Sequence, residues 1–230
     1  DKKKIADAVA KVKKRLGHNN LTALINNAGI AVLGPLEFLE SVEFQKQIEA
    51  NLIGVFNCTQ AFLPLLGSET SASEIKTGRI INISSALGGK LGYPFYGAYC
   101  ASKHAIEGFS ETLRRELKIH GIHVSIIAPG AIQTPIWNKA DTNSQDRKYE
   151  NTVYRSAYEK MLFDMKKLGE NGLKPEIVAS KIILAVEAKK PKIRYTFIRE
   201  FVLNLLYFAP RQLVDALITR YLGLTNNKLN

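Results

Sequence analysis

Tyr99 and Lys103 are the first pair of residues in this sequence that could carry out a reaction. They are four residues apart in a segment with helical periodicity, so both side chains lie on one face of the predicted helix. A tyrosine hydroxyl ordinarily has a pKa near ~10, and a cation beside it lowers that pKa by stabilising the phenolate. The pair therefore predicts a general acid or base for a carbonyl or an alcohol. In a lysine-rich chain the same spacing also arises by chance, with an exposed Tyr packed on a Lys stem.

Three further polar residues lie where they could assist such a reaction. Ser84 and Ser85 end a predicted strand, and ligands of open α/β folds bind at the carboxyl ends of parallel strands. A hydroxyl there can hydrogen-bond a substrate oxygen, although paired serines after a strand are often turn residues. Asn51 lies among apolar residues in a long predicted helix, where a buried amide needs partners. Taken alone, Asn51 is interpreted as a structural residue or as a polar site that holds water.

Alternating strands and helices must position these residues. This alternation predicts an α/β fold with a parallel sheet. Residues 21–25 are typical of a short buried strand, and an apolar stripe is predicted along the helix at 41–66. Predicted strands cover residues 21–25, 79–84, 122–128 and 193–198, and predicted helices cover 5–16, 41–66, 98–119, 153–168 and 175–188, with two short tail helices separated by Pro210.

The composition is that of a globular protein with one sizeable core. The chain has 230 residues, of which 46% are hydrophobic, and this favours one domain over two. Lys and Arg outnumber Asp and Glu by 32 to 21, which gives a formal net charge of +11. Such a charge suits nucleic acid, an anionic membrane surface or an anionic cofactor, or it is simply a solvated basic surface.

Two classes of function are disfavoured by what the sequence lacks. No helix-turn-helix, zinc or RNA-binding pattern is recognisable, so we predict no nucleic-acid partner. The four His and two Cys show no metal-ligand spacing, so we predict no metal site. Two cysteines are too few for a disulfide framework, which favours a reducing compartment, and we predict a cytoplasmic location.

Five motifs, in order along the chain, resemble those of the short-chain dehydrogenase/reductase family. The resemblance extends from residue 1 to about residue 198, and the segment 104–117 is similar to the single-domain branch with retinol- and hydroxysteroid-type members. The motifs are NNAG at 26–29, NLIG at 51–54, GRIINISS at 78–85, YCASK at 99–103 and Pro-Gly at 129–130.

The resemblance implies a catalytic tetrad of Asn51, Ser85, Tyr99 and Lys103. Tyr99 would donate or accept the hydroxyl proton, while Lys103 would lower the Tyr pKa and bind the nicotinamide ribose. Ser85 would orient the substrate oxygen, and Asn51 would hold a water that connects Lys103 to solvent. Ser84 remains the alternative to Ser85, because Ser85 lies fourteen residues before Tyr99, one more than is usual in the family.

The resemblance also implies a cofactor, NAD or NADP, and a Rossmann-like doubly wound parallel sheet. No Gly-rich pyrophosphate turn is present, so the chain is expected to start just before the family's fourth strand, as a fragment lacking the first strands. We therefore expect one incomplete dinucleotide-binding domain over 1–230, with the last strand and a helical tail at 193–230. The expected cofactor contacts are Asn27, Ala28, Gly29, Tyr99, Lys103, Pro129, Gly130, Ile132 and Thr134.

These observations predict an oxidoreductase that transfers a hydride between a nicotinamide cofactor and a carbonyl or alcohol substrate. The alternative is an inactive, truncated pseudoenzyme or scaffold. An apolar substrate, resembling a lipid, a steroid or a retinoid, is favoured by apolar residues that we expect to wall the pocket. These residues are Ile136, Trp137, Met161, Leu162, Phe163, Phe197, Phe201, Val202, Leu205, Leu206, Tyr207 and Phe208.

Two kinds of surface contact are also expected. The helices at 41–66 and 98–119 correspond to the family's usual dimer surfaces, so we predict a homo-oligomer. The apolar tail lies between basic residues that include Arg199, Arg211 and Arg220. An apolar stretch between cations suits an anionic membrane surface, so we also predict peripheral membrane contact, with packing on the core as the alternative.

Overall fold

A four-stranded parallel sheet forms the centre of the protein. The computed structural model describes residues 1–67, 78–86, 88–134, 148–199 and 201–225. The strands lie side by side in chain order, and the α/β Rossmann-like fold predicted from the sequence is confirmed. Each predicted strand agrees with the observed one to within two residues. The strands are β1 (Ala23–Asn26), β2 (Arg79–Ile83), β3 (His123–Pro129) and β4 (Arg194–Phe197).

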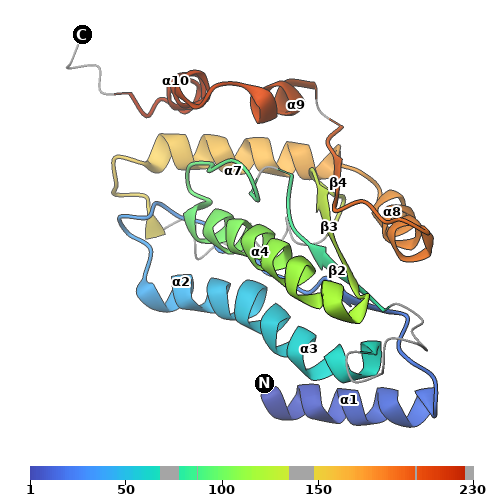
Figure 1. The fold of residues 1–230 in the computed structure, drawn as a ribbon. Coiled ribbons are helices and arrows are strands. Elements are labelled where there is room, and N and C mark those ends of the chain that lie inside the picture. The colour runs from blue at the N-terminus through green and yellow to red at the C-terminus, as the bar shows by residue number, and fades with distance from the viewer. Residues whose placement is uncertain (68–77, 87, 135–147, 200, 226–230) are drawn as a thin grey trace.

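Helices cover both faces of the sheet and the carboxyl ends of its strands (Figure 1). The predicted tail helices on either side of Pro210 are present. The description of residues 1–230 as one incomplete domain stays a prediction. The α-helices are α1 (Lys2–Leu16), α2 (Ser41–Ile48), α3 (Gly54–Phe62), α4 (Gly97–Glu116), α7 (Arg155–Glu170), α8 (Pro175–Glu187), α9 (Phe201–Phe208) and α10 (Arg211–Leu222).

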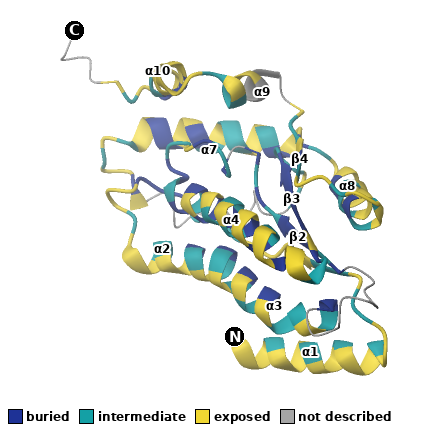
Figure 2. Cartoon of the chain, in the orientation of Figure 1, coloured by how far each residue is buried: buried dark blue, intermediate teal, exposed yellow. Residues whose placement is uncertain are grey.

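The alternation of side chains along β2 explains why helices pack on both of its faces. Ile80 points to one face and packs with Leu113 of α4, whereas Ile81 points to the other and packs with Val178 of α8. A strand buried on both faces needs an uninterrupted apolar run, as β2 and β3 have. Figure 2 shows the central strands buried and α1 largely exposed. The core thus lies along β2 and β3.

The first strand differs from the prediction of a buried strand. Among the described residues β1 pairs with β2 alone, so it is an edge strand. Ile25 is 42% exposed, because no described helix packs on its side of β1. Asn26, on the opposite side, is buried. The apolar composition of the segment indicated a strand correctly, whereas the predicted burial is met on the Asn26 side of β1 and not at Ile25.

The long helix predicted at 41–66 is present but is not regular throughout. A π-helical turn at Glu49–Ile53 separates α2 from α3, and a 3₁₀ turn at Leu63–Leu66 ends the segment. A π-turn inserts one extra residue into the helix, which changes the direction of the side chains that follow. Phe56, an apolar residue of the predicted helix that follows the π-turn, is consequently 43% exposed. Asn51 lies within the π-turn and is buried.

Buried amides tie the helices to the strands directly beneath the site. Asn26 Nδ2 donates to Asn82 Oδ1 at 2.8 Å and to Thr59 Oγ1 of α3 at 3.1 Å. Asn82 Nδ2 donates in turn to Ser110 Oγ of α4 at 2.8 Å. Because a buried polar group without a partner is costly, these bonds favour one alignment of the two helices on the sheet. The segments that leave β1 and β2 therefore start from fixed positions.

Candidate active site

A cavity of about 410 Å³ lies where the strands end. Its floor comes from the segments that follow β1, β2 and β3, and α4 provides one wall. The cavity brings together Ser85 and all nine residues that were predicted to contact the cofactor; Asn51 is absent from its lining. The lining includes Asn27, Ala28, Gly29, Ser84, Ser85, Tyr99, Lys103, Pro129, Gly130, Ile132 and Thr134.

Asn51 supports the floor of the cavity. Its Oδ1 accepts a hydrogen bond from the Ile30 amide at 2.9 Å, and its Nδ2 donates to the Ile30 carbonyl at 3.0 Å and to Ser102 Oγ at 3.1 Å. A Cβ on Gly29 would lie 3.2 Å from Asn51 Oδ1, so glycine lets this segment approach closely. The side chain of Asn51 thus fixes the loop after β1, and its water-holding role stays a prediction.

Gln47, one helical turn before Asn51, also holds the loop after β1, and the sequence did not single it out. Its Oε1 accepts from the Val32 amide at 2.7 Å, and its Nε2 donates to the Ile30 carbonyl at 2.8 Å. The side chain is completely buried. A buried amide four residues before Asn51, on the same helix face, was the available signal.

The Tyr99 hydroxyl lies beside Ser85 in this cavity. Burial raises the pKa of Tyr99, while a hydrogen bond with the Ser85 side chain acts in the opposite direction. Gly88 leaves the space that the ring needs, since a Cβ there would lie 2.6 Å from Tyr99 Cε1. The expectation that the pKa of Tyr99 is lowered is therefore not met in this structure, because desolvation outweighs the hydrogen bond.

Lys103 follows Tyr99 by one turn of α4 and is only 7% exposed. Its ammonium donates to the Ile83 carbonyl at 2.8 Å and lies 5.7 Å from the centre of the Tyr99 ring. Burial lowers the pKa of Lys103 to about 8, although the Glu107 carboxylate opposes this change. The amine can therefore gain or lose its proton near neutral pH.

The two adjacent serines have different partners. Ser84 is buried, and its hydroxyl donates to Glu107 Oε1 at 2.6 Å. The Ser85 hydroxyl accepts from the Gly88 amide at 3.1 Å and lies next to the Tyr99 side chain. Ser85, rather than Ser84, is thus the serine next to Tyr99, because the hydroxyl of Ser84 is already bound to a carboxylate.

The apolar wall of the cavity differs from the prediction. Met161 is buried in the core and Phe163 is largely exposed; Met165 and Leu168 of α7 line the cavity instead. None of the described tail residues lines it; Leu206 of α9 and Val214 of α10 pack instead in the core cluster that includes Tyr96. Ile136, Trp137 and the side chains of 201–204 lie outside the described residues. The observed apolar and aromatic wall is formed by Leu33, Tyr93, Tyr96, Tyr99, Met165 and Leu168.

Tyrosines of the segment before α4 form much of this wall, a feature that the sequence analysis missed. Tyr96 makes edge-to-face contacts with Tyr93 at 6.2 Å and with Tyr99 at 5.9 Å between ring centres. Burial raises the pKa of Tyr93 to about 12 and raises that of Tyr96 as well, so both hydroxyls stay protonated at neutral pH. Three tyrosines within the seven residues 93–99 were the available signal.

This arrangement suits a planar group lying between the Gly29 segment and the Pro129–Thr134 segment. The absence of side chains at Gly29 and Gly130 leaves backbone available on both sides, and Lys103 provides a donor from the wall formed by α4. The residues present therefore fit a nicotinamide ribose. Among the residues that the structure describes, no three His, Cys, Asp or Glu side chains gather as metal ligands.

Comparison with known proteins identifies the family. A family profile described as short chain dehydrogenase matches residues 1–145. The chain is 38% identical over 188 residues to an NADPH-dependent 3-dehydrocapnine reductase from Ornithobacterium rhinotracheale, covering 82% of this chain and 65% of that protein. It is 33% identical over 229 residues to retinol dehydrogenase 16 from Mus musculus, covering 93% and 68% of the two chains. This chain belongs to the short-chain dehydrogenase family of oxidoreductases.

A solved structure agrees with this assignment. A short-chain dehydrogenase from Streptomyces avermitilis superposes with a TM-score of 0.70 at 27% sequence identity, covering 97% of this chain and 76% of that one. The first three curated relatives are longer, and the chain spans 51–65% of their lengths. The activity of the complete protein is therefore treated below as a proposal.

The lowered pKa of Lys103 leads to a prediction about stability. Below pH 8 both folded and unfolded chains carry the ammonium, and its burial disfavours the folded state. Between pH 8 and 10.5 the unfolded chain binds more protons, so the free energy of unfolding should rise with pH. Between pH 7 and pH 10 the complete protein should therefore gain about 2–3 kcal/mol relative to Lys103→Met.

Denaturant unfolding at the two pH values measures this difference. Comparing the two proteins at each pH removes the contribution of titrating groups that the substitution does not touch. Lys118→Met, which replaces an exposed lysine in the 3₁₀ turn just after α4, is the control and should change stability little. A Lys103→Met effect that is equal at pH 7 and pH 10 would show that Lys103 is not desolvated as described.

Proposed function

We propose that the complete protein is a nicotinamide-dependent oxidoreductase that interconverts a ketone or an aldehyde with the corresponding alcohol. The observation that carries this proposal is the Tyr99 hydroxyl beside the Ser85 side chain, in a cavity whose wall includes Lys103. A proton donor beside a second hydroxyl can hold a carbonyl oxygen between them. Membership of the short-chain dehydrogenase family supports the same reaction class.

Each residue of the site has a distinct proposed role. In the reducing direction the Tyr99 hydroxyl donates its proton to the substrate oxygen, and in the oxidising direction the phenolate removes it. Ser85 hydrogen-bonds that oxygen and orients it. The Lys103 ammonium favours the phenolate, and Asn51 keeps the Ile30 segment in place. When bound, the cofactor supplies or accepts the hydride.

The cofactor is proposed to be NAD or NADP. The segment Asn27–Gly29 would hold one side of it and Pro129–Thr134 the other, with Lys103 donating to the ribose. The curated relative from Ornithobacterium rhinotracheale is named as NADPH-dependent, which supports a nicotinamide cofactor but does not choose between the two for this chain.

The substrate is proposed to be apolar. Leu33, Met165, Leu168 and the rings of Tyr93 and Tyr96 give the cavity a mostly apolar and aromatic wall, which favours lipid-, steroid- or retinoid-like molecules over sugars. The similarity to a retinol dehydrogenase supports this class. The wall residues differ from those predicted from the sequence, whereas the proposed substrate class is the same.

Replacement of Tyr99 by Phe tests the reaction. The substitution keeps the ring and removes the proton donor, so turnover of the complete protein should fall by roughly 10²–10⁴-fold. Steady-state rates with a polycyclic or long-chain ketone, and with a small polar ketone, are measured with NADH and NADPH. Tyr154→Phe, which also removes one hydrogen-bonded hydroxyl, should keep most of the activity. Normal turnover by Tyr99→Phe would rule out the mechanism, and preference for the polar ketone would rule out the substrate class.

Self-association through α3 and α4 is a second proposal. Ile53 and Phe56 are exposed on adjoining turns, and the Phe56 ring contacts that of Phe109 from α4 at 6.4 Å. An exposed Phe56 ring backed by the partly buried Phe109 of a second helix suits a self-complementary interface. Phe56→Glu should therefore shift the complete protein toward monomer in sedimentation at micromolar concentration, whereas Ile119→Glu, at another exposed apolar position, should not. A wild-type monomer under the same conditions would contradict the proposal.

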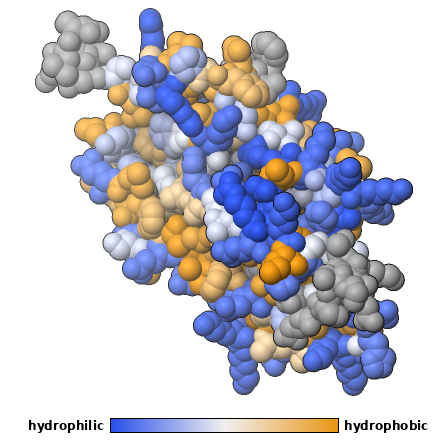
Figure 3. Space-filling view, viewed as in Figure 1, coloured by the Kyte–Doolittle hydropathy of each residue, from blue (hydrophilic) through white to orange (hydrophobic). Residues whose placement is uncertain are grey.

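Peripheral membrane contact by the tail is a third proposal. Leu205, Phe208, Leu213 and Leu217 are exposed on α9 and α10, and Figure 3 shows apolar atoms beside hydrophilic ones where these helices lie. The cations Lys90, Arg211 and Arg220 lie in or against the same helices. No helix in the described part of the chain is long and apolar enough to cross a bilayer. The proposed contact is with the surface of an anionic membrane, and the cytoplasmic location stays a prediction.

Vesicle flotation tests this contact. The double substitution Leu213→Gln with Leu217→Gln removes two exposed leucines one turn apart, so binding to phosphatidylserine-containing vesicles should weaken several-fold. Val153→Gln, which changes an apolar residue that is 91% exposed and lies outside the tail, is the matched control. Equal binding by all three proteins would exclude the tail as the contact.

A further inference from the structure

A polar cluster adjoins the site on the side of α4 that faces β4, and Glu107 is at its centre. Glu107 follows Lys103 by one helical turn and Tyr99 by two, so the three residues lie on one side of α4. Arg194 of β4 donates from Nε to Glu107 Oε2 at 3.0 Å and from Nη2 to Oε1 at 3.1 Å. Ser84, the residue before Ser85, donates to the same carboxylate.

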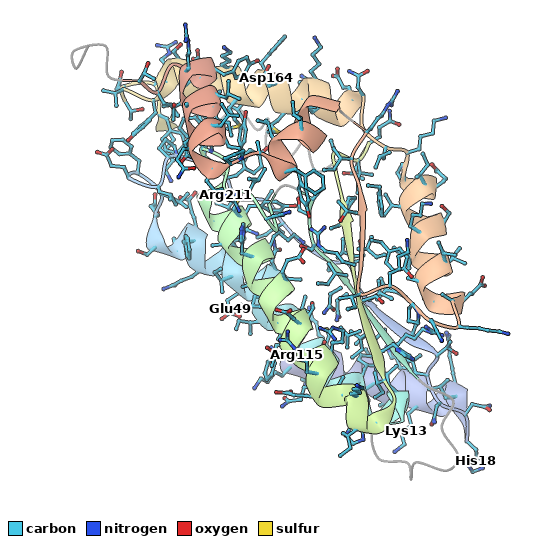
Figure 4. The ribbon with its side chains drawn as sticks, turned by 45° about the horizontal axis from the view of Figure 1, so that its top comes forward. Lys13, His18, Glu49, Arg115, Asp164 and Arg211 are labelled. Atoms are coloured by element: carbon cyan, nitrogen blue, oxygen red, sulfur yellow. The ribbon has the colours of Figure 1, made fainter. Side chains whose placement is uncertain are left out.

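The pairing of Glu107 with Arg194 differs from an ordinary surface ion pair. The two side chains are 20% and 21% exposed, and the contact is bidentate, which fixes the orientation of both groups. The buried Ser84 hydroxyl provides a further bond. By contrast, the Glu111–Arg115 pair one turn later is more than half exposed, and such pairs contribute little. Figure 4 shows Arg115 toward the end of α4 that lies away from the tail helices.

The cluster also connects three segments around the site. Arg194 Nη1 donates to the Tyr207 hydroxyl of α9 at 2.9 Å, and the Lys90 ammonium lies 3.8 Å from the centre of the Tyr207 ring. A Cβ on Gly89 would lie 2.5 Å from Ser84 Oγ and 2.7 Å from Glu107 Oε1. The loop that follows Ser85 is therefore packed directly on the carboxylate.

We propose that Glu107 is a positioning residue of this site, whose carboxylate, held by Ser84 and Arg194, provides the negative charge for the Lys103 ammonium and holds the strand end that carries Ser85. The inference rests on the proposed function, because it concerns the charge of a lysine with a proposed role in that reaction. Glu107 itself does not line the cavity of Tyr99, and it acts through its neighbours.

The charges around Lys103 make the direction of this effect unambiguous. Burial disfavours the ammonium, and Glu107 is the group that raises the pKa of Lys103 again. Removing the Glu107 charge should lower that pKa further, and the Arg194 guanidinium left behind should act in the same direction. The titratable and charged groups that face this region are Tyr99, Cys100 and Glu107 of α4, Arg194 of β4, Tyr207 of α9, and Lys90, Tyr93 and Tyr96 of the segment before α4.

Competitive labelling measures the predicted effect without requiring turnover. The complete protein is treated with trace acetic anhydride between pH 6 and pH 11, and acetylation of Lys103 is quantified by peptide mass spectrometry. In Glu107→Gln the midpoint of reactivity should move to lower pH, on the order of one unit, which is the scale of one nearby charge at a buried group. Glu111→Gln, which removes an equal charge one turn away, should leave the midpoint unchanged. Glu107→Asp, which restores the charge, should bring it back.

The direction of the shift distinguishes this role from a structural one. Loosening of the fold would expose Lys103 and move its midpoint up toward 10.5, the opposite of the predicted change. Should Glu107→Gln fail to fold, Arg194→Gln provides the test, because an uncompensated carboxylate should move the midpoint upward while circular dichroism stays native. Equal midpoints in the folded variants would overturn the proposal.

The kinetic consequence is measured separately. If Lys103 must be charged for reduction, the alkaline limb of kcat/KM should move down in Glu107→Gln by the same amount as the labelling midpoint. Absence of turnover in the unsubstituted protein would contradict the proposed function, and the labelling result would still decide the role of Glu107. A labelling shift without a matching shift of the kinetic limb would overturn the link between Glu107 and the reaction.

Discussion

The Lys103 ammonium is almost completely removed from water, and much of the surrounding structure compensates for that removal. An isolated buried charge is costly, so it is retained where hydrogen bonds and opposite charges offset the lost hydration. The Ile83 carbonyl at the end of β2 accepts one hydrogen bond, and Glu107 provides an opposite charge held by Arg194. These partners come from two strands and one helix, so the lysine can be buried only when α4, β2 and β4 have their observed arrangement.

A set of buried amides maintains that arrangement. Asn26 and Asn82 join the first two strands to α3 and α4, while Gln47 and Asn51 hold the loop after β1 through the backbone of Ile30. Apolar packing alone tolerates small sliding motions of helices on a sheet, whereas buried hydrogen bonds are satisfied in one register only. The positions of Tyr99 and of the cofactor segment therefore depend on residues that do not touch the reacting groups.

The two halves of the cavity serve different purposes under the proposed function. The strand ends and α4 provide the proton donor and the cofactor contacts, which members of the short-chain dehydrogenase family share. Most of the apolar and aromatic wall comes from the segment before α4, with Tyr93 and Tyr96, and from α7, with Met165 and Leu168; neither is part of the sheet. A fold of this kind can therefore retain its chemistry while side chains outside the sheet change the substrate.

The sequence by itself determined the strands, most helix boundaries, the family and the residues that line the cavity floor, because these depend on local periodicity and on motifs close together in the chain. Only the tertiary structure decided features that depend on distant partners. The π-turn at Asn51 exposes Phe56, and the contact with Glu107 distinguishes Ser84 from Ser85. Met165, rather than Met161, reaches the cavity because the rotation of α7 is set by its packing on the core. Arg194 and Glu107 are 87 residues apart in the chain, and no local sequence pattern predicts the ion pair between them.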